Sequence, residues 1–254
     1  MKLDRPISPP PRPSGFTVME MLVSVTLLGV IVFGLYAMFN QTARALRQVT
    51  RQAEVFDGGR ATMGLVAREV QEMVAAGRDN VVNAFATNVS NLTQSRPGGG
   101  DQVNVLQDIY FLTRQNDNWT GTGYRIDDIA AGVGTLSRFT TNSTADGVNG
   151  FFGVFGLAST NDFHLVAEGV IHFQMLPFDA AGRLHTNLTA NGFSFTNNYL
   201  PAYVDFELGI LEPQALKQFR TFTDTSMAED FLKRQIGRVQ LFRQRLQIRN
   251  HHEP

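Results

Sequence analysis

The chain has 254 residues, of which 43% are hydrophobic and 18% charged, and its formal net charge is −1. This length and composition allow one soluble domain of moderate size in addition to a membrane helix. Because the chain has no cysteine, it has no disulfide framework, zinc–thiolate site or cysteine nucleophile. A charge near zero gives no indication of bulk nucleic-acid binding, which favours a basic domain.

Residues 1–15 are rich in proline and are not expected to be helical. This segment has a formal charge of +2, and residues 16–254 have a formal charge of −3. A secretory signal peptide carries its apolar core before its cleavage site, whereas here the apolar run follows the short proline-rich segment. We refer to residues 1–15 as the leader, and the order of the two segments predicts that the apolar one is retained.

Residues 16–39 are apolar or small almost throughout, and Glu20 is the only formal charge among them. A helix of this length extends about 36 Å, enough to cross a hydrocarbon core of about 30 Å. A carboxylate inside such a span costs about 2.5–3.5 kcal/mol on insertion scales and is usually paired or functional. We predict a membrane-spanning helix in which Glu20 is functional. The alternative is an ordinary signal anchor that tolerates one acid near its end.

The order Gly15, Phe16 and then Glu20, the fifth residue counted from Phe16, resembles the processing site of type IV pilins and type II secretion pseudopilins. The resemblance implies that prepilin peptidase cleaves between Gly15 and Phe16, and that Phe16 becomes an N-methylated N-terminus. It also implies an assembly role for Glu20. The Glu20 carboxylate can neutralise the α-amino cation of Phe16, on the same or a neighbouring subunit, where a low dielectric strengthens the pair.

Charge does not decide the orientation of the span, because Arg44, Arg47 and Arg51 follow it and rival the cations of the leader. The resemblance implies a cytoplasmic leader, a single pass through the bacterial inner membrane and a periplasmic head. From there the protein would enter a periplasmic or extracellular fibre. The implied partners are other pilins or pseudopilins, prepilin peptidase, the inner-membrane assembly platform and membrane lipid.

The helical pattern continues after residue 39. Residues at alternating spacings of three and four form a stripe on one helical face. They are Leu46, Val49, Ala53, Phe56, Arg60, Met63, Ala67, Val70 and Val74. We expect residues 40–76 to form an amphipathic helix that packs on a sheet and on neighbouring subunits. Within it, Gly58 and Gly59 mark a bend or a close approach, or are simply tolerated.

Residues 77–254 are expected to form a β-rich globular head, which makes the fold class α+β and pilin-like. Hydrophobic patterning predicts strands at 103–113, 124–129, 134–140, 164–176, 200–209 and 238–249. Helices are expected at 212–222 and 226–235, the second opened by a capping box of Ser226 and Glu229. Residues 94–100, 116–123, 141–150 and 187–198 are expected to form loops or turns.

Scattered segments of the head also resemble J-type minor pseudopilins and the related W-type minor pilins. These segments are 110–113, 123–126, 135–138, 165–173, 200–204 and 248–250. The N-terminal pattern carries most of the resemblance, because it is the more specific of the two.

Polar residues of the head give little indication of chemistry. His164 and His172 are eight positions apart, wider than the usual spacing of metal ligands on one strand. Asp117, Asp127 and Asp128 could supply oxygen ligands for Ca²⁺, but no loop has the EF-hand spacing. No Gly-x-Ser-x-Gly turn or phosphate-binding glycine loop is present. We therefore predict no catalytic residue, no metal site and no cofactor.

Arg243, Arg245 and Arg249 alternate along the last predicted strand. They form either a solvated face paired with acidic residues or a basic stripe for nucleic acid. The paired face is the more common arrangement, so nucleic acid is not expected as a partner.

The sequence thus predicts a structural subunit, not an enzyme: a minor pilin or pseudopilin of a type II secretion pseudopilus or a type IV pilus. Two alternatives remain open. One is a binding module, such as a fibre-tip adhesin or a DNA-uptake pseudopilin. The other is a membrane-anchored enzyme whose site is assembled from distant residues in a deep polar pocket.

Overall fold

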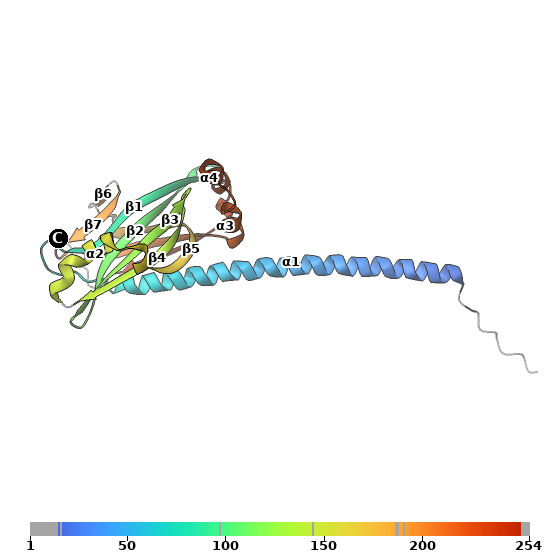
Figure 1. The fold of residues 1–254 in the computed structure, drawn as a ribbon, viewed down its shortest axis with the longest axis horizontal. Helices are drawn as coiled ribbons and strands as arrows, with labels where there is room; N and C mark the ends of the chain where they lie inside the picture. The colour runs from blue at the N-terminus through green and yellow to red at the C-terminus, as the bar shows by residue number, and fades with distance from the viewer. Residues whose placement is uncertain are drawn as a thin grey trace, which may run out of the picture. The chain divides into compact units, whose positions relative to one another are not determined.

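The computed structural model describes residues 15, 17–96, 98–143, 145–185, 188–189 and 191–249. The chain divides into two units, residues 1–50 and residues 51–254. Helix α1 (Val18–Gln71) begins in the first unit and ends in the second, and every other helix and strand belongs to the second unit (Figure 1). The predicted α+β composition is therefore confirmed.

A single sheet forms the frame of the second unit. Its described strands are β1 (Val82–Ser95), β2 (Asp101–Gln115), β3 (Asn118–Ala130), β4 (Val133–Ser143), β5 (His164–Phe178), β6 (Leu188–Thr189), β7 (Gly192–Thr196), β8 (Tyr203–Leu211) and β9 (Val239–Gln247). They lie in the order β6-β7-β1-β2-β3-β4-β5-β8-β9, with antiparallel neighbours. Strand β5 also meets β2 in parallel, where Leu106 pairs with Phe173. The sheet therefore curls until these two strands touch.

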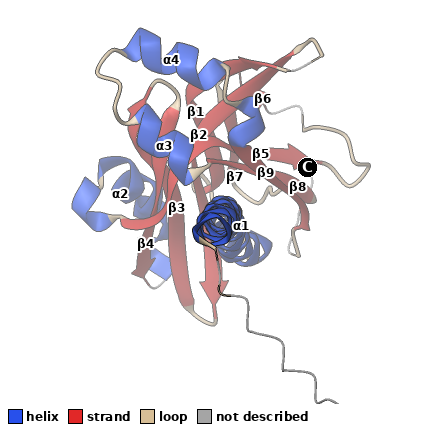
Figure 2. Cartoon of the chain, turned by 90° about the vertical axis from the view of Figure 1, so that its right-hand side faces the viewer, coloured by secondary structure: helices blue, strands red, loops and turns tan. Residues whose placement is uncertain are grey.

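Three short helices accompany the sheet (Figure 2). They are α2 (Phe151–Leu157), α3 (Pro213–Phe219) and α4 (Thr225–Lys233), with 3₁₀ turns at Ala145–Gly150, Thr160–Asp162 and Ile236–Arg238. Helix α2 packs Phe151 and Phe155 into one apolar cluster with Tyr110 and Leu112 of β2. Helices α3 and α4 cover a third cluster, which includes Ile171 of β5.

Alternation along β2 separates the two main clusters of the core. Ile109 and Phe111 join the residues buried against the C-terminal part of α1, whereas Tyr110 and Leu112 join the cluster under α2. Successive side chains of a strand point to opposite faces of the sheet. The sheet is therefore covered on both faces within the second unit, which explains why β2 is so apolar.

The predicted stripe on α1 is confirmed in part. Met63, Ala67 and Val70 are buried against the sheet, but Ala53 and Arg60 are exposed. The buried face is instead completed by Val55, Gly59, Thr62 and Val66. Gly59 marks a close approach, because a Cβ atom there would overlap the ring of Phe242 on β9. The glycine thus allows the helix to lie directly on the sheet edge.

Helix α1 ends at Gln71, so the expectation of a helix through residue 76 is wrong at its C-terminal end. Beyond it, Met73 forms an isolated bridge with Thr113, and the Val74 amide donates to the Leu112 carbonyl at 3.0 Å. The chain leaves the helix early because these backbone groups find partners on β2. Helical periodicity in the sequence contains no information about these hydrogen bonds to β2, so it does not predict where the helix ends.

Several boundaries in the head also differ from the predictions. The hydrophobic pattern of the sequence did not predict β1, because polar and apolar residues do not alternate regularly along it. The segment 187–198, which was expected to be a loop, contains β6 and β7. Phe193 and Phe195 of β7 are buried, so this segment is part of the core. Strand β5 continues through Pro177 to Phe178, and α2 is a helix that the sequence analysis did not predict. The six predicted strands are confirmed as β2, β3, β4, β5, β8 and β9, but β3 begins at Asn118, so most of the turn predicted at 116–123 is strand.

The cap of α4 differs too. Asp224, not Ser226, caps this helix, and its carboxylate accepts from the Ser226 amide at 2.8 Å. The capping box predicted from Ser226 and Glu229 is therefore wrong. Because Asp224 lies two positions earlier, the helix begins at Thr225 and both residues of the supposed box lie inside its first two turns.

A charged group on α1 anchors the helix to the sheet. The Arg138 guanidinium on β4 donates to Glu69 Oε1 at 2.6 Å, and the Tyr124 hydroxyl on β3 donates to Glu69 Oε2 at 2.5 Å. The side chains of Glu69 and Arg138 are only 14% and 26% exposed. Partly buried charges with complete hydrogen bonding fix geometry, and removing one partner leaves the other uncompensated.

We expect Glu69→Ala to lower the free energy of unfolding by about 3 kcal/mol, because it leaves Arg138 half-buried without its counter-ion. Thermal unfolding of the full chain in detergent measures the change. The matched control is Glu72→Ala, one turn away and exposed, which should change stability by less than about 0.5 kcal/mol. Equal effects of the two substitutions would contradict the anchoring role.

Candidate functional site

The first part of α1 carries an apolar surface that the rest of the described chain does not cover. Residues Val18–Arg47 form a candidate membrane span, none of which is buried. Large side chains along it are open, for example Phe33 at 73% and Phe39 at 72% exposure. Soluble proteins rarely expose contiguous apolar patches above a few hundred Å². By length and composition this helix can cross a membrane, as the sequence predicted.

Glu20 lies in the first turn of α1 and bonds to the residue that precedes the helix. Its Oε2 accepts from the Thr17 amide at 3.0 Å and the Thr17 hydroxyl at 3.1 Å. In return, the Thr17 hydroxyl oxygen accepts from the Glu20 amide at 3.2 Å. This reciprocal arrangement is a capping box, which satisfies two backbone donors at the helix start.

The capping box gives Glu20 a local role that the sequence reasoning missed. The pattern Thr-Val-Met-Glu from Thr17 to Glu20 carries the required Thr-x-x-Glu spacing, so the signal was available. The carboxylate is also favourable there because the helix dipole places positive potential at an N-terminus. Within the described residues, only Oε2 of Glu20 is used in these hydrogen bonds. Because Oε1 takes no part in these bonds to Thr17, an amino cation could donate to it.

Gly15, the residue before the expected cleavage site, lies outside the helix. Gly15 is exposed and has no regular secondary structure, and α1 begins three positions later. A Cβ atom at Gly15 would meet no atom within 4 Å. Phe16, the expected new N-terminus, lies outside the described residues. Exposed backbone without regular secondary structure is accessible to a peptidase.

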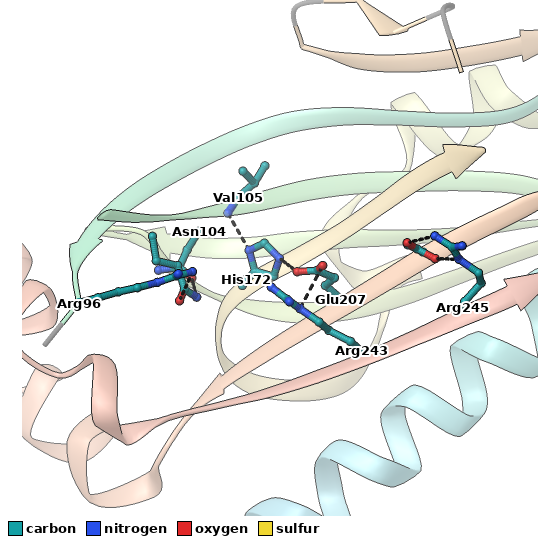
Figure 3. Close-up of polar contacts among 9 residues, drawn as sticks. Arg96, Asn104, Val105, His172, Glu207, Arg243 and Arg245 are labelled. Carbon is teal, nitrogen blue, oxygen red and sulfur yellow. Dashed lines mark hydrogen bonds and ion pairs between the residues drawn. The ribbon is translucent and has the colours of Figure 1, made fainter. Parts of the chain in front are cut away.

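In the head, a buried histidine bridges the seam between β2 and β5 (Figure 3). His172 Nδ1 accepts from the Val105 amide at 3.0 Å, and Nε2 lies 3.1 Å from Glu207 Oε2. The other oxygen of Glu207 pairs with Arg243 Nε at 3.1 Å. A neutral imidazole protonated on Nε2 fits both contacts, because Nδ1 must accept and Nε2 then donates.

Two other side chains of β2 accept backbone hydrogen bonds where strand pairing is sparse, Gln107 at the seam with β5 and Asp108 at the ladder with β3. Gln107 Oε1 accepts from the Met175 amide at 2.8 Å, and Asp108 Oδ1 accepts from the Ile126 amide at 2.9 Å where β3 diverges from β2. Burial raises the pKa of Asp108 to about 6, against the opposing hydrogen bond from Ile126. A shifted pKa is a common mark of a functional site. Here it has a structural cause, because Asp108 occupies a gap in the sheet ladder.

The His172 seam predicts a loss of stability in acid. Burial lowers the pKa of His172 below its ordinary 6.5, an effect that Glu207 opposes. The unfolded chain therefore takes up this proton at a higher pH than the folded chain, so the stabilisation present above about pH 6.5 declines as pH falls.

Between about pH 7 and pH 5, His172 lowers the free energy of unfolding as the pH falls, whereas Asp108, with its pKa raised to about 6 in the folded chain, increases it. The contribution of His172 is therefore a difference between variants: His172→Asn should lose less stability than the wild type over this range, and His164→Asn, at an exposed position, should keep the wild-type slope. An unchanged slope in His172→Asn would show that another group is responsible. Denaturant unfolding at several pH values provides the measurement.

The remaining sequence candidates are not brought together. Asp117 lies in the β2–β3 turn with a fully exposed side chain, whereas Asp127 lies toward the opposite end of β3 and pairs with Arg125 at 2.8 Å. Asp128 follows with a positive φ of 52°. No group of three or more His, Asp or Glu side chains close enough to hold a metal occurs among the described residues.

One pocket of about 370 Å³ lies between β1, the β3–β4 turn and α4. Its lining includes Ser90, Thr93, Gly132 and two charged residues, Glu229 and Lys233. A single acid and a single amine on one helix face do not form a nucleophile–base pair or a metal site. This pocket therefore gives no support to the membrane-anchored enzyme alternative.

The arginines of β9 have acidic partners on β8. Arg243 pairs with Glu207, and Arg245 makes a two-pronged contact with Asp205 at 2.6 and 2.7 Å. The prediction of a strand face paired with acidic residues is confirmed for these two arginines. Their charge is locally neutralised, which weakens the case for a nucleic-acid surface.

No protein-family model matches this chain, and no curated protein or solved structure is significantly similar to it. What the geometry establishes is an α+β protein with a candidate membrane-spanning helix at its N-terminus. The finer assignment depends on the residues at the start of that helix.

Proposed function

We propose that this chain is a minor pilin or pseudopilin, a structural subunit of a type II secretion pseudopilus or a type IV pilus. The supporting observation is the start of α1. There, an exposed glycine outside the helix precedes an uncovered apolar span whose only acid lies in the first turn. In this proposal, prepilin peptidase cleaves after Gly15, Phe16 becomes the methylated N-terminus, and the head lies in the periplasm.

The apolar surface of α1 can be covered in two environments, the inner membrane and the assembled fibre. In the inner membrane, lipid covers the side chains from Val18 to Phe39. In the fibre, the apolar helices of other subunits replace the lipid. Because lipid tails are as apolar as leucine, this exchange has little hydrophobic driving force. Packing and polar pairing must therefore supply the direction and register of assembly.

Glu20 is well placed to provide that pairing. Cleavage after Gly15 would create a cation on the residue directly before Thr17, and consecutive backbone nitrogens are about 3–4 Å apart. The Thr17 amide already donates to Glu20 Oε2. Oε1 can then accept from the new amino group of the same subunit or a neighbour. In a low-dielectric surrounding such a pair is much stronger than in water.

We expect Gly15→Ala to leave the precursor uncut. The added methyl group meets no atom within 4 Å, so any loss of cleavage reflects recognition and not misfolding. Mass spectrometry of the N-terminus measures the outcome. Gly58→Ala, an equally unobstructed position within α1, is the control and should be processed normally. A wild-type protein that still begins at Met1, or a Gly15→Ala protein that begins at Phe16, would refute the cleavage site.

A second experiment separates the capping role of Glu20 from its charge. Glu20→Gln retains a side-chain acceptor for the Thr17 amide but loses the negative charge. Thr17→Ala retains the charge but removes the hydroxyl half of the capping box. We expect Glu20→Gln and Glu20→Ala to reduce incorporation into fibres by at least about fivefold, the effect of losing one charge-assisted hydrogen bond.

Thr17→Ala should assemble nearly normally, and all these variants should remain in the membrane fraction. Crosslinking of subunits in isolated fibres gives the incorporated fraction. If Glu20→Gln assembles as well as wild type while Glu20→Ala does not, Glu20 acts only as a helix cap.

A further inference from the structure

A basic segment follows the apolar part of α1. Arg44 and Arg47 are both exposed, and Arg51 comes one turn later in the same helix. No acidic residue occurs between Glu20 and Glu54 in the sequence, so Arg44 and Arg47 have no acidic residue within six positions of them in the chain. This part of α1 thus combines an uncovered apolar surface with two exposed cations.

The distances place these arginines at a membrane surface. Arg44 and Arg47 follow Phe39 by about 7 and 12 Å along the helix axis, at 1.5 Å per residue. The polar headgroup region adds about 5–7 Å on each side of the hydrocarbon core. If the apolar residues up to Phe39 span the core, the backbone of Arg44 lies at the outer edge of the headgroup layer and that of Arg47 about 5 Å beyond it.

The orientation of the Arg44 and Arg47 side chains brings their guanidinium groups closer to the lipid headgroups. Helical side chains lean toward the N-terminus of their helix, which here is the direction of the apolar span. Arg47 shows this directly, because its Nε donates to the Ala43 carbonyl one turn earlier, at 3.1 Å. A long arginine side chain can therefore extend its guanidinium back into the headgroup layer.

We propose that Arg44 and Arg47 bind the phosphate groups of anionic phospholipids at the surface where the span ends, an inference that rests on the proposed membrane insertion of α1. Guanidinium groups suit phosphate because their planar donors can engage two oxygens at once. Each basic residue near an anionic surface raises affinity about fivefold. The pair would hold the unassembled subunit at a fixed depth, and these contacts must break when it leaves the membrane.

The test uses the full chain in nanodiscs that contain both phosphatidylcholine and phosphatidylglycerol. Native mass spectrometry of the released protein counts the lipids of each kind that stay bound. The variant Arg44→Gln/Arg47→Gln is compared with Arg60→Gln/Arg68→Gln, which removes the same charge from exposed positions farther along α1. We expect wild type and the Arg60/Arg68 control to retain phosphatidylglycerol preferentially. The Arg44/Arg47 variant should lose that preference by about 25-fold, about fivefold for each arginine.

Three outcomes would overturn the proposal while leaving the membrane anchor intact. The wild type could insert without any preference for phosphatidylglycerol, or the Arg44/Arg47 variant could keep the preference. The variant could also leave the lipid counts unchanged but reduce the number of copies per nanodisc, which would assign the arginines to a second copy of the chain. Failure of the wild type to insert at all would instead refute the anchor itself.

Discussion

The apolar surface of α1 between Val18 and Phe39 is the constraint on which the rest of the protein depends. No other described part of the chain buries it, and water disfavours so much contiguous apolar area. The segment therefore requires an apolar environment that this chain does not supply: lipid, or the helices of other subunits. This requirement explains the proposed roles of the polar residues at the two ends of the segment. These residues are Glu20 at the start and the arginines beyond Phe39.

The second unit buries its apolar side chains within itself, so it does not need another chain to complete its hydrophobic core. The buried side chains of α1 beyond residue 50 pack on one face of the sheet, and α2 covers the other. Glu69, Arg138 and Tyr124 fix the helix with charged hydrogen bonds, and Gly59 allows the close contact with Phe242. The seam at His172 closes the curl of the sheet with side-chain acceptors where backbone pairing between β2 and β5 is limited to one pair. The fold thus joins a self-contained head to a helix that needs partners.

Glu20 illustrates how one residue can serve two purposes. As a cap, its carboxylate accepts from the Thr17 amide, which would otherwise lack a partner at the helix start, so Glu20 has a role even in a simple membrane anchor. As a charge, it can also pair with a new amino terminus through its second oxygen. The two roles are compatible because a carboxylate accepts several hydrogen bonds, and the cap holds its oxygens in place. Because the cap already explains why an acid occurs at this position, Glu20 alone is weaker evidence for an assembly role than an unpaired acid would be. Gly15 therefore contributes more to the proposal of a pilin-like subunit.

The sequence by itself determined the membrane-competent helix, the α+β class and the strands with dense apolar or β-branched residues, such as β2, β5 and β8, because these depend on local composition and periodicity. It also contained the capping pattern from Thr17 to Glu20, although that pattern was not recognised as such. Only the tertiary structure decided where α1 ends, because the amide of Val74 donates to the Leu112 carbonyl on β2 and not to a carbonyl within the helix. It likewise placed the polar strand β1 and the phenylalanines of β7 in the sheet, and it brought His172, Glu207 and Val105 together from three strands. Such contacts join residues far apart in the chain, so their energy has no counterpart in any local pattern.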